Sequence, residues 1–126
     1  MYETQPLPRL HLLPRVLDTL EITANGRISS VFVTQQMMQE TGATVALTED
    51  FINFPRSLQG VEVALLFREI NPQKYRVSLR SRGRVDVARI AGMFQGGGHP
   101  SASGCTVEGD LSQVRNKVLG VVKAAL

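Results

Sequence analysis

The clearest hydrophobic pattern lies in the middle of the chain and predicts two neighbouring strands. Residues 61–70 are almost continuously apolar, as in a strand buried on both faces. After a turn at residues 71–73, apolar and polar positions alternate. The apolar positions are Tyr75, Val77 and Leu79, and the polar positions are Arg76, Ser78 and Arg80. Because side chains alternate between the faces of a strand, we expect one face in the core and a cationic, hydrogen-bonding surface on the other.

The N-terminal part predicts a short helix followed by a hairpin. Leu10, Leu13 and Leu17 have helical spacing, within a segment whose helix Pro14 limits or kinks. Two strand segments, 20–23 and 28–33, flank the pair Asn25-Gly26, which favours a type I′ turn. Thr34 is expected to cap a helix that Gly42 ends. Thr48 and Asp50 offer a second capping site before the apolar pair Phe51-Ile52.

The C-terminal part predicts two helices with a short strand between them. Residues 85–94 have apolar positions at helical spacing, and Thr106-Val107 indicates a short strand. Asp110 and Gln113 resemble a capping box at the start of the last helix. The expected core stripe of that helix is Leu111, Val114, Val118, Val121, Val122 and Ala125. The order of elements predicts an α/β (α+β) fold with a central, mainly antiparallel mixed sheet flanked by helices. Residues 1–8 are expected to be a tail or linker, and residues 9–126 one domain.

Positive charge is concentrated in the third quarter of the chain. The net charge is +3, but residues 1–55 hold three basic against six acidic residues, whereas residues 56–99 hold eight against three. Most of these cations are arginines, whose planar fork suits bidentate phosphate binding. The single cysteine, Cys105, fits a reducing compartment and is expected to be a small buried residue. Neither a signal peptide nor a membrane span is evident, so we expect a cytoplasmic protein with no membrane partner.

A glycine-rich segment follows the basic region and predicts a phosphate-binding loop. Residues 96–104 read Gly-Gly-Gly-His-Pro-Ser-Ala-Ser-Gly. Three glycines expose backbone N–H groups to an approaching anion, and His99 can donate or exchange a proton there. The chain has only two histidines, His11 and His99, and no metal-binding spacing. The sequence therefore predicts a chain that binds a phosphate without holding a metal to cleave it.

Three segments of this region carry a family resemblance. They are Val77-Ser78-Leu79-Arg80-Ser81, Val85-Asp86-Val87-Ala88-Arg89-Ile90-Ala91 and residues 96–104. Together they resemble the DHHA1 domain, the C-terminal half of DHH-family phosphoesterases. With residues 56–64 included, the resemblance is closest to the nanoRNase/pAp phosphatase branch. Gln95 stands where the family pattern usually has a fourth glycine, and Ser103 where it has an alanine.

The resemblance implies a function in which this chain binds substrate and another domain cleaves it. Members of that branch degrade very short RNA oligonucleotides and dephosphorylate 3′-phosphoadenosine 5′-phosphate. A separate N-terminal domain with an Asp-His-His motif, absent here, holds two metal ions, usually manganese. At the matching positions of this sequence, the resemblance implies that Arg80 and Ser81 bind the sugar-phosphate or base side of the substrate. Gly96, Gly97, Gly98 and His99 line the pocket of the scissile phosphate, and His99 is a candidate transition-state contact. Arg56 lies at the rim.

Other interpretations of the same residues stay open at this stage. The chain can be a free-standing nucleic-acid-binding module that takes single-stranded RNA or DNA. It can also be a homodimerisation domain, if an exposed Val31-Phe32-Val33 segment pairs with a second copy. Arg80 can be an ordinary exposed arginine, and His99 can merely bond a backbone carbonyl. Ser81 falls on the apolar face by strict alternation, so it needs a bulge or a strand end to reach a ligand.

Overall fold

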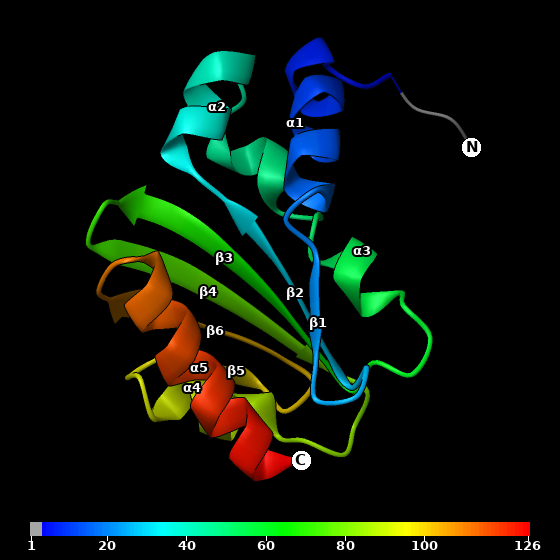
Figure 1. Cartoon of the computed structure of the whole chain (residues 1–126), viewed down its shortest axis with the longest axis vertical. Helices are drawn as coiled ribbons and strands as arrows, with labels where there is room; N and C mark the ends of the chain where they lie inside the picture. The colour runs from blue at the N-terminus through cyan, green and yellow to red at the C-terminus, as the bar shows by residue number, and fades with distance from the viewer. Residues whose placement is uncertain (1–3) are drawn as a thin grey trace.

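A six-stranded sheet with helices on both faces organises the chain (Figure 1). The structure is a computed structural model that describes residues 4–126, so the first three residues of the predicted tail lie outside it. The elements are α1 (Leu7–Leu17), β1 (Glu21–Thr23), β2 (Ile28–Val33), α2 (Gln35–Thr41), the 3₁₀ helix η1 (Val45–Thr48), α3 (Asn53–Arg56), β3 (Val63–Asn71), β4 (Lys74–Ser81), α4 (Val87–Gly92), β5 (Gly97–His99), β6 (Ala102–Glu108) and α5 (Leu111–Ala125). The predicted α+β class with a mixed sheet is confirmed.

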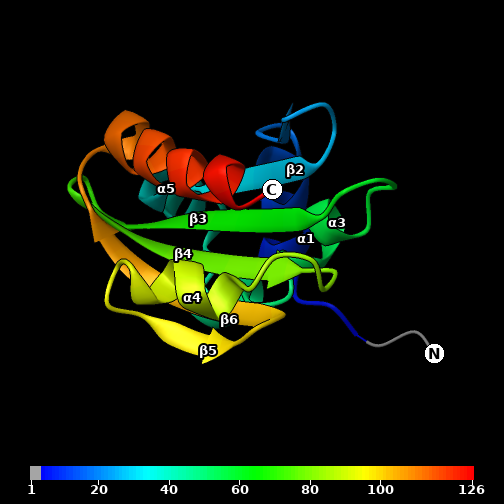
Figure 2. The same ribbon diagram turned by 90° about the horizontal axis from the view of Figure 1, so that it is seen from below.

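The strands lie in the order β1-β2-β3-β4-β6-β5, which Figure 2 shows from below. Among the strands of residues 4–126, only β2 and β3 pair in parallel, and the other pairs are antiparallel. The sheet is therefore mainly antiparallel, as the sequence predicts.

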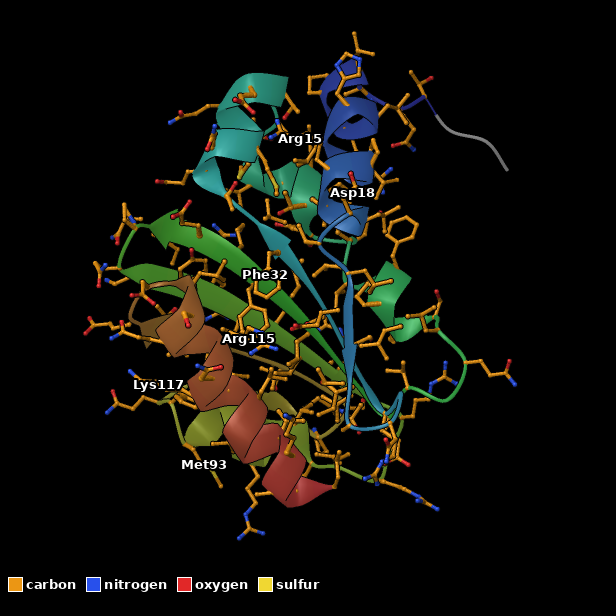
Figure 3. All side chains as sticks on the ribbon, in the orientation of Figure 1. Arg15, Asp18, Phe32, Met93, Arg115 and Lys117 are labelled. Atoms are coloured by element: carbon orange, nitrogen blue, oxygen red, sulfur yellow. The ribbon has the colours of Figure 1, made fainter. Side chains whose placement is uncertain are left out.

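Each face of the sheet has its own apolar core. One core contains Phe67, Val77 and Cys105 and is covered by α4 and α5. The aromatic rings of Phe32 and Phe67 stack in this core at 4.9 Å between centroids, and Figure 3 shows Phe32 on the side of the sheet that α5 covers. The other core contains Ala64 and Leu66 and lies under the N-terminal helices and their loops.

Several turns and helix caps form as the sequence predicts. Asn25 and Gly26 both have positive φ angles, of 57° and 85°, as a type I′ turn requires. The Thr34 side chain accepts the N–H of Met37 at the start of α2, and Gly42, with a φ of 75°, ends that helix. The predicted capping box of Asp110 and Gln113 is formed at the start of α5.

Several boundaries and surfaces differ from the sequence predictions. Helix α1 begins at Leu7, inside the predicted linker, and runs through Pro14 to Leu17. Thr48 donates to the Val45 carbonyl instead of capping a helix, and Asp50 pairs with Arg9. In the last helix Leu119 is buried, whereas Ala125 is exposed. The exposed Val31-Phe32-Val33 segment on which the alternative of a homodimerisation domain depended is also wrong, because these residues are buried inside the sheet.

The N-terminal helices cover only part of their face of the sheet. They pack on β2 and β3, so no helix of the described chain lies over the same face of β4, β6 and β5. Residues of this uncovered part are half-buried or exposed although they lie within a sheet. We call this surface the open face; its residues are Arg76, Ser78 and Arg80 of β4, Ala102, Gly104 and Thr106 of β6, and Gly97 and His99 of β5.

Candidate functional site

Strand register brings the predicted arginine and histidine to the same surface. Arg80 of β4 pairs with Ala102 of β6, and Ala102 pairs with His99 of β5. Directly paired residues share a face of a sheet, so Arg80 and His99 flank a single alanine. Arg80 and His99 are 19 positions apart in sequence, and only the pairing of β6 between β4 and β5 makes them neighbours.

The orientation of the His99 ring is set by Ser101. The N–H of Ser101 donates to His99 Nδ1 at 3.1 Å, and Ser101 Oγ lies 2.9 Å from the same nitrogen. Since Nδ1 accepts a hydrogen bond, the neutral ring carries its proton on Nε2. His99 therefore does not bond a backbone carbonyl through Nδ1, and its exposed ring can present an Nε2–H donor on the open face.

The glycine segment is an edge strand rather than the expected loop of bare amides. Gly97 and Gly98 pair with β6 as part of β5, and the N–H of Gly96 donates to the Ala91 carbonyl at 2.8 Å. A Cβ on Gly96 would lie 2.2 Å from the Gly104 carbonyl oxygen, and one on Gly98 would lie 2.7 Å from that of Ala102. These two glycines permit close approach of β5 to β6, whereas a Cβ on Gly97 would meet open space.

Arg80 lies half-buried with a second positive charge beside it. Burial, followed by the charge of Arg56, lowers the pKa of Arg80 from its ordinary value. Its guanidinium donates to the carbonyl of Leu79 at 2.9 Å. Arg56, at the end of α3, is exposed, and its carbonyl accepts a hydrogen bond from Arg82. Arg80 and Arg56 thus form a positively charged rim at one end of the open face.

Ser81 is not brought to this surface. It pairs with Val63 at the end of β4, on the face that α4 and α5 cover. Its hydroxyl accepts the N–H of Gly83 at 3.0 Å, and its own N–H donates to the Ser101 carbonyl. In this structure Ser81 connects the end of β4 to the following turn and to the β5–β6 hairpin.

Two further arginines contribute charge to this region: Arg76 of the open face, which the alternation in β4 predicted, and Arg68 beside it on β3, which the sequence did not single out. Arg68 of β3 pairs with Arg76 of β4, and both line a cavity of about 470 Å³ together with Ser78 and Arg80. Arg76 was recognisable from its alternation with the core residues of β4. Arg68 was not, because residues 61–70 were predicted to be buried on both faces, whereas burial ends at Phe67.

The comparison with known families agrees with this arrangement. The DHHA1 domain family matches residues 29–126, which is most of the chain. The chain belongs to the DHHA1 family. The resemblance seen in the sequence segments is therefore confirmed, and it extends over β2 to α5.

Curated relatives of this DHHA1 chain are considerably longer proteins. It is 32% identical over 123 residues to the bifunctional oligoribonuclease and PAP phosphatase NrnA of Thermus thermophilus, covering 97% of this chain and 36% of that protein. It is 35% identical over 89 residues to a probable NrnA of Streptococcus mutans, covering 71% and 28%. The chain thus spans about a third of the length of these relatives.

Solved structures share the fold. An exopolyphosphatase-related protein from Bacteroides fragilis superimposes with a TM-score of 0.81 at 27% identity, covering 98% of this chain and 35% of that one. A pGpG-specific phosphodiesterase from Vibrio superimposes with a TM-score of 0.59 at 8% identity, covering 94% and 38%. The second likeness concerns the fold alone.

The two departures from the DHHA1 pattern have visible consequences. Gln95, in place of a glycine, has a φ of 62°, a left-handed conformation that side chains with a Cβ rarely adopt. Ser103, in place of an alanine, is buried and donates to the Val87 carbonyl at 2.6 Å, which connects β6 to α4.

A roomier cavity, of about 640 Å³, lies between α4 and α5 of the DHHA1 domain. Its walls are mainly apolar, with Ile90, Val121 and Met93, whose side chain is labelled in Figure 3, and Arg84 and Arg89 line it beside the acidic Asp86. His99 and Arg80 do not line it. We assign the candidate site to the open face because phosphate recognition needs charge and hydrogen-bond donors, which converge there.

Metal ligands do not gather in the described part of this DHHA1 domain. Within residues 4–126, no three His, Cys, Asp or Glu side chains come close enough to hold an ion. The residues present therefore do not fit a manganese site. None of the helices within the same range combines the length and hydrophobicity needed to cross a membrane.

Proposed function

We propose that this chain is the substrate-binding part of a DHH phosphoesterase that hydrolyses short oligonucleotides, 3′-phosphoadenosine 5′-phosphate, or both. The observation that carries the proposal is the convergence of Arg80 and His99 on one uncovered sheet face. The names of its curated relatives, oligoribonuclease and PAP phosphatase, support the substrate class. The greater length of these relatives supports substrate binding by this chain and cleavage by another domain.

The chemistry of the open face suits a phosphate ester. Arg80 offers a planar fork of donors, and its partial burial strengthens the attraction to an anion by excluding water. His99 adds an Nε2–H donor on the other side of Ala102. Arg56 contributes positive potential from the rim without direct contact with the phosphate. These groups bind and orient the substrate; we assign the grip on the sugar-phosphate to Arg80 and the phosphate contact to His99.

Cleavage, in this proposal, takes place at a partner domain across a cleft. A manganese pair held by an Asp-His-His domain would activate the attacking water and neutralise the developing charge. The 126-residue chain alone is accordingly inactive. Hydrolysis of a short oligoribonucleotide by the purified chain with Mn²⁺ would contradict this part of the proposal.

Binding of a fluorescently labelled ribonucleotide trimer, followed by anisotropy, tests the role of the open face. We expect Arg80→Gln and His99→Ala each to weaken binding about tenfold or more, since each removes hydrogen bonds to a charged group. Affinity should also fall steeply with added salt.

Arg27→Gln is the matched control because it removes one positive charge from the exposed turn between β1 and β2. It should leave the affinity within about twofold of the unaltered chain. Equal losses in the Arg27 and Arg80 variants would mean that net charge alone attracts the trimer, and the assignment to the open face would be wrong.

A further inference from the structure

Arg68 and Arg76 form a like-charge pair in the middle of the sheet. They are directly paired between β3 and β4, and like charges in such positions repel. Among residues 4–126, neither guanidinium has a carboxylate within 4.0 Å. Burial, followed by the charge of Arg76, lowers the pKa of Arg68 from its ordinary value. The fold thus brings two arginines to one cavity, and among the described residues neither has a carboxylate within salt-bridge distance.

The surroundings of this pair form a built cavity. Its volume is about 470 Å³, within the range of small-ligand sites. One wall consists of Val45 and Thr48 of η1 and of Glu49, which follows η1. The floor consists of sheet residues, namely Leu66, Arg68, Arg76, Ser78 and Arg80. Of the described residues that line it, Glu49 alone is acidic, and its charge acts on Arg68 from more than salt-bridge distance.

Gly104 allows Arg76 to lie flat on β6. A Cβ at position 104 would lie 2.7 Å from one terminal nitrogen of Arg76, and that guanidinium also contacts the Thr106 hydroxyl at 3.5 Å. Arg76 therefore extends along the open face towards the position that Ser78 shares with Gly104. Its guanidinium therefore lies between the level of Arg68 and the end of the open face where Arg80 lies.

We propose that Arg68 and Arg76 form a second phosphate-binding subsite, which takes a phosphodiester further along the oligonucleotide than the one beside His99. This inference rests on the proposed function of the open face. Arg76 and Arg80 lie four positions apart on one strand, which is about 13 Å at 3.3 Å per residue. A stacked strand advances by about 3.4 Å per nucleotide, so the end phosphates of a dimer lie about 3 Å apart and those of a tetramer about 10 Å apart. The Arg76 guanidinium lies beside Gly104, at the level of Ser78, and this covers the remaining distance for a tetramer but not for a dimer. The pair therefore makes binding depend on strand length.

Calorimetric titration of the 126-residue chain with ribonucleotides of one, two, three and four residues tests this inference. For the unaltered chain we expect affinity to rise about tenfold or more between the dimer and the tetramer, as a second phosphate gains charged hydrogen bonds. In the double variant Arg68→Gln/Arg76→Gln that rise should disappear, whereas mononucleotide and dimer affinities should fall only by the smaller factor expected from the loss of nearby positive charge. Arg27→Gln, which also removes an arginine, should keep the rise.

Stability gives an independent readout of the same pair. Arg76 is exposed, and its replacement by Gln relieves repulsion, so Arg76→Gln should melt at the same temperature as the unaltered chain or higher. A lower melting temperature would indicate a structural role and would overturn the inference.

The outcomes separate this inference from the proposed function. Binding of the dimer through Arg80 without any rise for the tetramer overturns the second subsite alone. Equal losses for dimer and tetramer in the double variant overturn its dependence on length. Failure of every oligonucleotide to bind the unaltered chain contradicts both proposals.

Discussion

At the scale of single residues, the open face and its border with β3 hold arginines whose charged form is disfavoured by burial and by neighbouring arginines. Arg68 and Arg80 are both half-buried, and burial together with a neighbouring arginine lowers the pKa of each. Elsewhere arginines pair with acids, as Arg115 does with Glu21. Cations held together without such partners are typical of an anion-binding surface, because a bound anion relieves both the burial and the repulsion.

Gly104→Ala tests whether the position of Arg76, and not only its charge, matters. The added Cβ displaces the Arg76 guanidinium, which is the flexible end of a side chain, so the free energy of unfolding should not fall by more than about 0.5 kcal/mol. Affinity for a ribonucleotide tetramer, measured by calorimetry, should fall about threefold or more through the loss of a charged hydrogen bond. Gly120→Ala adds a methyl group to open space on α5 and should leave that affinity unchanged. A Gly104→Ala chain that binds normally would show that Arg76 does not need to lie on β6.

Gln95→Gly tests the strained connection before β5. Because Gln95 has a φ of 62°, glycine should raise the free energy of unfolding by roughly 0.5–1 kcal/mol, measured by urea denaturation. Gln95→Ala keeps a Cβ in the same conformation and serves as the control, with no gain expected. Equal stabilities of the glycine and alanine variants would contradict the assignment of strain to this position.

At the scale of elements, an ion pair connects the edge strand β1 to the last helix. Arg115 of α5, labelled in Figure 3, donates to both carboxylate oxygens of Glu21, from Nε and from a terminal nitrogen, each at 2.7 Å. These bonds from Arg115 lower the pKa of Glu21 below its ordinary value of 4.5. A lowered pKa in the folded state stabilises the fold above that ordinary value, and the gain is lost as the pH falls through the lowered one.

Glu21→Gln should therefore lower the free energy of unfolding at pH 7 by about 0.5–1 kcal/mol, the range for a partly exposed pair. The difference from the unaltered chain should shrink as the pH falls well below 4.5, since Glu21 is then protonated in both states. Chemical denaturation at several pH values measures it. A difference that stays constant with pH would mean that the carboxylate charge is not what Arg115 recognises.

Elements with a strong hydrophobic period were predictable, whereas those made by pairing alone were not. The alternation in β4 and the capping box of α5 depend on local chemistry, and the structure confirms both. β5 has no such signal, because Gly-Gly-His lacks strand propensity and becomes a strand only by pairing with β6. For the same reason the first half of β6, Ala102–Gly104, was predicted as part of a loop.

Individual residues of the candidate site were predictable from the sequence, whereas their proximity was not. Arg80 could be found from alternation and His99 from its glycine-rich context, but their proximity depends on β6 pairing between them. Ser81 was singled out by the family resemblance, although alternation puts it on the other face. The partial exposure of Arg68 was not predictable, because Arg68 lies in an apolar run and the sequence alone does not show where burial along β3 ends.

At the scale of the whole molecule, the two helical layers leave one part of the sheet uncovered. α4 and α5 cover one face, whereas α1, α2 and α3 lie over β2 and β3 on the other, as Figures 1 and 2 show together. The uncovered strands β4, β6 and β5 meet the corner at η1, and the cavity with the three arginines lies there. This charged, uncovered surface is the one to which the proposed function assigns the substrate.

Amide correlation spectra of the ¹⁵N-labelled chain, recorded during titration with a ribonucleotide trimer, report directly which surface meets the nucleic acid. We predict that the largest shifts occur in the strands of the open face, at residues 76–80, 97–99 and 102–106. Unchanged signals in these strands, or shifts confined to the groove between α4 and α5, would contradict the account.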